Sequence, residues 1–285
     1  MRHFAFLLLG LGLLSLVGAL QVPTLQAQNR NDDPARVQRE AADSLGQRVY
    51  LAACSGCHGL RGDGNGPGAQ GFAQHPTDFT QGTYKLRSTT GAVPAPGDLE
   101  HTIRVGMSGS EMVPFGRILS ERSIHAVAQY IRGFSPDLAD PEVQPEADEV
   151  VPVPAQRPFP PSEQSIAEGK RVYDDNCADC HGDSGEGDTD QTDDWDFPVV
   201  MVSFRLGYYK SGPTDQDLFR TIVTGMNGTT MEGYKEDLSA DETWKVVDYI
   251  RSLGRSEDRG LKGLIVMVFN FFLRTQPSGF DYSNY

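Results

Sequence analysis

The sequence predicts an all-α protein made of two tandem helical domains that an acidic, proline-rich linker joins. Three observations predict this fold class: an internal repeat relates the two halves, helical periodicity closes each half, and a proline-rich stretch separates them. We expect the first domain over residues 40–134, the linker over 135–162 and the second domain over 163–254.

The internal repeat keeps residue types, order and spacing over most of each half. Each copy has Gly-x-Arg-Val-Tyr before a cysteine motif, Phe…Gly…Tyr-Lys after it, and then Asp-Leu…Thr-Ile…Gly-Met. The matched ranges are 46–50 with 169–173, 79–85 with 204–210, and 98–107 with 217–226. Because one unit is encoded twice, two equivalent domains follow.

Helical periodicity is clearest at the end of each copy. Ser239 and Glu242 form a predicted capping box before apolar residues spaced along one helix face, and Ser120 caps the equivalent helix of the first copy. Opening helices are expected over 40–53 and 164–176, each running into its cysteine motif. The glycine-rich stretches expected to be loops are 59–71 and 182–187. Between the domains, the proline-rich composition predicts an extended, semi-rigid spacer.

Charge is unevenly distributed along the chain. The formal net charge is −14, from 25 Lys and Arg against 39 Asp and Glu, and this argues against a nucleic-acid partner. Residues 28–134 carry a net charge of +1, residues 135–162 carry −5 and residues 163–254 carry −12. The acidity therefore belongs to the linker and the second domain, where it indicates either a solvated face or a docking surface for a basic protein.

Both ends of the chain carry apolar segments. Residues 1–27 have the charged start, apolar centre and small-residue exit of a secretory signal cleaved after Ala27, and an uncleaved N-terminal anchor is the alternative. The tail, 255–285, contains an apolar run over 264–273 that is too short to cross a bilayer. That run either packs back on the domains or associates with a membrane surface or a partner subunit. We expect a periplasmic, exported protein.

All four cysteines belong to two Cys-x-x-Cys-His motifs, whose main chemical meaning is covalent attachment of haem. The motifs are Cys54-Ser55-Gly56-Cys57-His58 and Cys177-Ala178-Asp179-Cys180-His181. Zinc would need two such pairs to converge on one ion, and a thioredoxin-like dithiol would need a βαβ context that the flanking residues lack. We therefore expect two covalently bound haem c groups, with the histidines as iron ligands.

The second axial ligand of each iron is expected to be a methionine from a later loop. Met112 and Met231 occupy equivalent places in the repeat, just before the last helix of each copy, and are favoured over the earlier pair, Met107 and Met226. His75 is a lesser candidate for the first haem.

At these residues both halves resemble class I cytochrome c domains, joined as a tandem dihaem cytochrome c. The resemblance covers roughly 40–134 and 164–254, and in that family a Gly-x-x-Gly-x-x-Met loop supplies the distal ligand, here Met112 and Met231. It also implies a proline carbonyl that holds the proximal histidine, for which Pro67 is the candidate in the first half.

The resemblance implies an electron carrier that serves redox protein partners, as a subunit of a respiratory oxidoreductase or as a mobile protein. An iron bound by both His and Met has no place for substrate, so we expect electron transfer and no enzymatic activity. The alternative is a dihaem enzyme of the peroxidase or small-molecule oxidase type with one open haem site. The acidic second domain would lower the reduction potential of its haem, so that electrons run from the second haem to the first.

Overall fold

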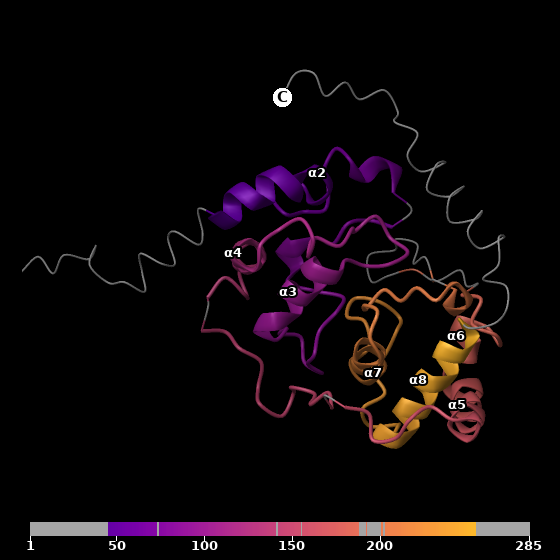
Figure 1. The fold of residues 1–285 in the computed structure, drawn as a ribbon. Helices are drawn as coiled ribbons and strands as arrows, with labels where there is room; N and C mark the ends of the chain where they lie inside the picture. The colour runs from indigo at the N-terminus through magenta and orange to yellow at the C-terminus, as the bar shows by residue number, and fades with distance from the viewer. Residues whose placement is uncertain are drawn as a thin grey trace, which may run out of the picture. The chain divides into compact units, whose positions relative to one another are not determined.

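The structure, a computed structural model, describes part of the chain in detail (Figure 1). The described residues are 45–72, 74–140, 142–154, 156–187, 192, 201 and 203–254. The chain divides into two units, 1–38 and 39–285, and every described residue lies in the second. The expected signal or anchor over 1–27 and the apolar run over 264–273 lie outside the described residues. None of the helices that the structure describes is long and apolar enough to cross a bilayer.

The described regular structure is helical, and the all-α prediction is confirmed. The first copy of the repeat contains a helix whose described part is 45–53, followed by α2 (Ser55–His58), η1 (Ala69–Gly71), η2 (Phe79–Gln81), α3 (Pro96–Val105) and α4 (Glu121–Arg132). The second copy contains α5 (Glu163–Asn176), α6 (Ala178–His181), η3 (Phe204–Leu206), α7 (Asp215–Thr224) and α8 (Ala240–Leu253). An isolated antiparallel bridge pairs Thr89 with Val150.

The structure contains the helix N-caps that the sequence predicts. The Ser239 hydroxyl accepts the backbone N–H of Glu242 at 3.3 Å, while the Glu242 carboxylate accepts the N–H of Ser239 at 2.9 Å. Ser120 accepts the N–H of Ser123 at 3.1 Å at the start of α4. Two helices, α3 and α7, were not predicted, although Thr214 and Asp217 form the same reciprocal cap at the start of α7. The loop expected over 59–71 ends in the 3₁₀ turn η1.

The opening and closing helices of each copy cross in direct contact at a glycine. Figure 1 shows α5 and α8 lying side by side, and a Cβ atom added at Gly169 would overlap the carbonyl of Lys245 on α8. Gly46 meets the carbonyl of Ala126 on α4 in the same way. The glycine of the repeated Gly-x-Arg-Val-Tyr sequence is therefore required by close helix packing.

The segment expected to be a spacer packs against both copies. Leu138 is buried in the apolar core of the first copy, and Val151 is buried in that of the second. The N–H of Val151 donates to the carbonyl of Ser88 at 2.9 Å, beside the bridge between Thr89 and Val150. Apolar burial and backbone hydrogen bonds therefore hold this extended segment against the two helical domains.

Candidate haem-binding site

The two cysteine motifs form matching short helices at the ends of the opening helices. In each motif the N–H of the histidine donates to the carbonyl of the first cysteine at 2.9 Å, for His58 to Cys54 and for His181 to Cys177. All four thiols are free and partly exposed. Burial, followed by the neighbouring cysteine of each pair, raises the pKa of Cys54 to about 11 and that of Cys177 to about 12.

Each motif histidine is covered by a phenylalanine that the repeat conserves. The rings of His58 and Phe79 stack with centroids 4.4 Å apart, and those of His181 and Phe204 with centroids 4.8 Å apart. Burial lowers the pKa of His58, and burial together with the Lys210 cation lowers that of His181 to about 4. Both imidazoles are thus neutral at pH 7, which is the state that can bind a metal. Sequence reasoning missed the phenylalanines, although their recurrence in both copies was a signal.

The carbonyl that orients the first histidine belongs to Thr77. His58 Nδ1 lies 3.1 Å from the Thr77 oxygen, so the expectation of Pro67 is wrong. The acceptor comes just before η2, on the same segment as Phe79, because this segment folds back over the histidine ring. Among the described residues, Nδ1 of His181 has no hydrogen-bond partner. The position equivalent to Thr77 is residue 202, which lies outside them.

A buried tyrosine is hydrogen-bonded to the residue that follows each cysteine motif. The Tyr50 hydroxyl donates to the carbonyl of Gly59 at 2.7 Å, and the Tyr173 hydroxyl donates to that of Gly182 at 2.8 Å. Both tyrosine side chains are fully buried. This hydrogen bond joins the opening helix to the residue that follows the histidine, so each motif is held from both sides. The sequence contained the signal in the repeated Gly-x-Arg-Val-Tyr.

The methionine loops of the two copies share one hydrogen-bonded frame. In the first, the N–H of Met107 donates to the carbonyl of Met112 at 2.9 Å, and in the second Met226 donates to Met231 at the same distance. A hydroxyl closes each loop, from Ser110 to the carbonyl of Met107 at 2.7 Å and from Thr229 to that of Met226 at 2.7 Å. Equal loop geometry follows from equal spacing in the sequence.

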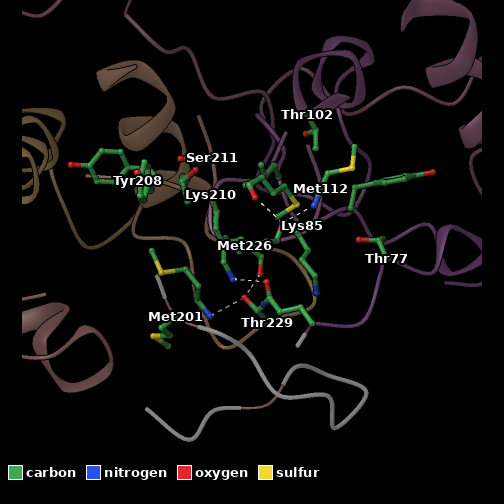
Figure 2. A pocket seen from close by; sticks show the side chains of 18 of the residues that line it. Thr77, Lys85, Thr102, Met112, Met201, Tyr208, Lys210, Ser211, Met226 and Thr229 are labelled. Carbon is green, nitrogen blue, oxygen red and sulfur yellow. Dashed lines mark hydrogen bonds between the residues drawn. The ribbon is translucent and has the colours of Figure 1, made fainter. Parts of the chain in front are cut away.

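One cavity of about 370 Å³ brings both cysteine motifs and both methionine loops together. Its lining includes Cys54, Cys57, His58, Met107, Met112, Cys177, Cys180, His181, Met226 and Met231, and also His75. Figure 2 shows Met112 and Met226 among the side chains that face this space. All the predicted ligand residues are therefore gathered at one place, and both methionines of each loop reach it.

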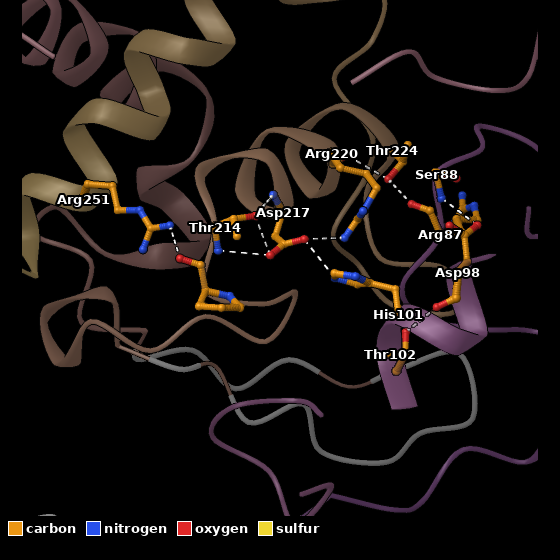
Figure 3. Close-up of polar contacts among 11 residues, drawn as sticks. Arg87, Ser88, Asp98, His101, Thr102, Thr214, Asp217, Arg220, Thr224 and Arg251 are labelled. Carbon is orange, nitrogen blue, oxygen red and sulfur yellow. Dashed lines mark hydrogen bonds and ion pairs between the residues drawn. The ribbon is translucent and has the colours of Figure 1, made fainter. Parts of the chain in front are cut away.

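Direct contacts between the two copies surround this cavity. The N–H of Asn227 donates to the carbonyl of Lys85 at 3.1 Å, and the Thr224 hydroxyl donates to the carbonyl of Arg87 at 3.1 Å. Figure 3 shows His101, on α3, directed at Asp217, on α7, with Nε2 and Oδ1 2.9 Å apart. The backbone beside the second methionine loop is thereby tied to the segment after η2.

The outer surfaces of the two copies differ at equivalent positions. Four large apolar side chains are exposed on the first copy beside its cysteine motif and methionine loop. The repeat places an acidic residue at each of these positions in the second copy, and the pairs are Leu51 with Asp174, Leu60 with Asp183, Val113 with Glu232, and Ile118 with Asp237. The charge difference between the halves therefore extends to the surroundings of the two sites.

The geometry fits a covalently attached haem at each motif. A free thiol pair on a helical turn is followed by a buried neutral histidine, and beyond it lies a largely apolar cavity with thioether sulfurs on loops that line it. Two such helical domains define a c-type haem protein.

The family model for cytochrome c matches residues 44–135 and 166–254, which together make up more than half of the chain. The chain belongs to the cytochrome c family, and its two domains account for two covalently bound haem c groups.

Comparison with known proteins finds similarity to cbb3-type cytochrome c oxidase subunits and to a chain of an HAO-like protein complex. A chain of the Kuenenia stuttgartiensis reducing HAO-like protein complex is 35% identical with a TM-score of 0.67, over 73% of this chain and 95% of that one. The cbb3-type cytochrome c oxidase subunit CcoP of Azospirillum brasilense is 26% identical over 217 residues, 73% of this chain and 61% of that protein. Subunit FixP of Azorhizobium caulinodans is 26% identical over 218 residues, 75% of this chain and 60% of that protein. The chain thus spans about three fifths of the length of these two subunits.

Proposed function

We propose that this protein is a periplasmic dihaem electron-transfer subunit, which passes single electrons between redox partners of a respiratory complex. The observation that supports this most strongly is the shared cavity, because two one-electron centres that face the same space can exchange electrons within one chain. Similarity to oxidase subunits and to a chain of the HAO-like complex supports placement in such a complex. The export signal expected over 1–27 supports the periplasmic location.

The residue roles follow the repeat. The proposed thioether attachments are at Cys54 and Cys57 in the domain over 40–134, and at Cys177 and Cys180 in the domain over 163–254. The residues that would bind iron are His58 with Met112 in the first domain and His181 with Met231 in the second. When bound, haem c supplies an iron that gains or loses one electron. The chain keeps each imidazole neutral and covers it with a phenylalanine ring, and the Thr77 carbonyl orients that of His58. A methionine loop of each domain would supply the thioether, since both loops line the same cavity.

The experiment that tests this function is addition of carbon monoxide to the fully reduced, haem-loaded protein, followed by visible spectroscopy. We expect no binding at either haem, because a histidine and a methionine would already bind each iron. Met112→Ala should create one carbon monoxide site, while the matched variant Met107→Ala should create none. The pair Met231→Ala and Met226→Ala should repeat this result in the second domain.

The contrary result would favour the dihaem enzyme. Stoichiometric binding of carbon monoxide at one haem of the unmodified protein would mean that this site is open, and the electron-transfer proposal would fail for it. The proposed ligand Met231 would then be rejected first, because its loop lacks the proline that follows Met112. Val113 and Pro114 come after Met112, whereas Glu232 and Gly233 come after Met231.

A further inference from the structure

Two lysines at equivalent positions of the repeat lie at the boundary between the two domains. Lys85 and Lys210 each follow the tyrosine of the repeated Phe…Gly…Tyr-Lys pattern, and both are half-buried in the wall of the shared cavity. Figure 2 shows both among the cavity-lining side chains, together with Met112 and Met226. The repeat therefore places one cation per domain in the same space.

Each lysine is engaged with the other domain. Lys210 Nζ donates to Oε1 of Gln74, in the first domain, at 3.1 Å. The carbonyl of Lys85 accepts the N–H of Asn227, next to Met226 in the second domain, at 3.1 Å. Burial and the Lys85 cation lower the pKa of Lys210 to about 8, opposed by the Glu111 carboxylate, so the two cations and this one anion act on each other.

A third polar group of the cavity wall points to a ligand. The Tyr84 side chain is only 4% exposed and lines the cavity, and its hydroxyl has no hydrogen-bond partner among the described residues. A buried hydroxyl without a partner is costly, which indicates that something bound in the cavity accepts from it. Lys85, the next residue, lines the same cavity, and its ammonium group indicates that the acceptor is an anion.

Haem carries two such anions, the carboxylates of its propionate side chains. We propose that Tyr84, Lys85 and Lys210 form one carboxylate-binding site at the boundary of the two domains, which holds propionates of both haems and couples their reduction potentials. This inference rests on the proposed dihaem function and adds three positioning residues to it. They would act on the haem iron through the haem carboxylates and through the electric field in the cavity.

The electrostatic consequence has a definite sign. Oxidised haem iron carries one more positive charge than reduced iron, so a nearby cation in a poorly solvated cavity disfavours the oxidised form and raises the reduction potential. Because both lysines line the cavity that the two haem sites share, neutralising either one lowers both potentials. A lysine that served a single haem would change only one of them.

The test is a spectroelectrochemical titration of the protein carrying both haems, with Lys85→Met and Lys210→Met. Each variant is expected to lower both midpoint potentials, with about a tenfold change in the ratio of reduced to oxidised haem, or about 59 mV for one electron. The matched control is Lys245→Met, which removes the same charge from α8 at a side chain paired with Glu168. It should move either potential by less than half as much. Lys210→Arg keeps the charge, so both of its midpoint potentials should equal those of the unmodified protein.

Two results would overturn the proposal: shifts no larger than those of Lys245→Met, or shifts confined to one of the two haems. If a lysine variant does not accumulate with two haems, Tyr84→Phe decides, because it removes only the hydroxyl. This variant should lower both potentials by more than the control, and an unchanged titration or a shift at one haem alone would reject the shared site. Intact mass separates the two levels of inference. Fewer than two haems on the unmodified chain would contradict the proposed function, whereas two haems with unmoved potentials would contradict only the shared site.

Discussion

Nε2 of His101 and Oδ1 of Asp217 lie 2.9 Å apart and join α3 of the first domain to α7 of the second. Asp217 is buried and also accepts from Thr214, in its own cap, and from Arg220. The same carboxylate thus starts a helix and links two domains. The equivalent Asp98 also accepts from the N–H groups of Ala95 and Ser88, all within the first domain, so the cross-domain link is a property of one copy only.

Removing the imidazole should weaken the protein moderately. His101→Ala deletes the cross-domain partner of Asp217 but leaves Arg220 and Thr214 in place, so we expect a loss of about 1 kcal/mol in the free energy of unfolding. Denaturant unfolding monitored by circular dichroism measures it. The control is His125→Ala, whose side chain is 59% exposed and contacts Glu100 within the same domain. Equal losses for both variants would mean that the link contributes nothing of its own.

Stability should also fall in acid because of Asp217. Burial alone would raise the pKa of its carboxyl, but contacts with His101 and Thr214 outweigh burial and lower this pKa to about 2. A group with a lowered pKa in the folded state stabilises the protein above its unfolded pKa, so this contribution is present at pH 5 and is lost as the pH falls from about 4 to 2. Its size is on the order of 2 kcal/mol.

The measurement is denaturant unfolding from pH 5 to pH 2 for the unmodified protein and for Asp217→Asn. The stability difference between the two should shrink as the pH falls, because protonation makes the carboxyl resemble the amide. A difference that stays constant over this range would show that the carboxylate charge is not the stabilising feature.

The glycine at the start of each methionine loop should not tolerate a side chain. Gly106 has φ +69° and ψ −165°, a region almost restricted to glycine, and an added Cβ would lie 2.6 Å from the carbonyl oxygen of Met112. Gly106→Ala should cost about 1–3 kcal/mol and displace the loop. Thermal unfolding measures the first effect, and carbon monoxide binding to the reduced first haem measures the second.

The matched variant is Gly97→Ala, in α3, where an added Cβ would meet no atom within 4 Å. This change should be neutral or stabilise the helix by up to about 1 kcal/mol, and it should create no carbon monoxide site. If Gly106→Ala behaves in the same way, the backbone of the methionine loop adapts and the glycine has no positional role.

The acidic residues around the second site should lower its reduction potential. Replacing Asp174 and Glu232 by the residues of the first copy, Leu and Val, should raise the potential of the second haem. We expect the free energy of reduction of this haem to change by about 0.2–1 kcal/mol, and by less at high salt, because these charges are solvent-exposed and screened. A redox titration at two salt concentrations measures both effects.

The reciprocal exchange is the control. Leu51→Asp with Val113→Glu should lower the potential of the first haem by a similar amount. If the second haem of the unmodified protein already has the higher potential, surface charge does not set the order of the two haems, and electron flow from the second to the first is not driven by it.

The sequence by itself determined the features that depend on local order. The repeat, the two Cys-x-x-Cys-His motifs and the reciprocal cap of Ser239 and Glu242 involve residues a few positions apart, and backbone geometry at that range depends on the neighbouring side chains. Family membership and two haems could therefore be predicted without coordinates.

Only the tertiary structure decided which distant residues meet. The acceptor for His58 is Thr77 and not Pro67, because the segment before Phe79 folds back over the imidazole. The shared cavity and the contact between His101 and Asp217 join residues more than a hundred positions apart. Such contacts depend on how two separately encoded domains pack, and composition and periodicity describe each domain alone. The structure therefore decided that both sets of predicted haem-binding residues line one cavity, whereas the sequence determined that there are two sets.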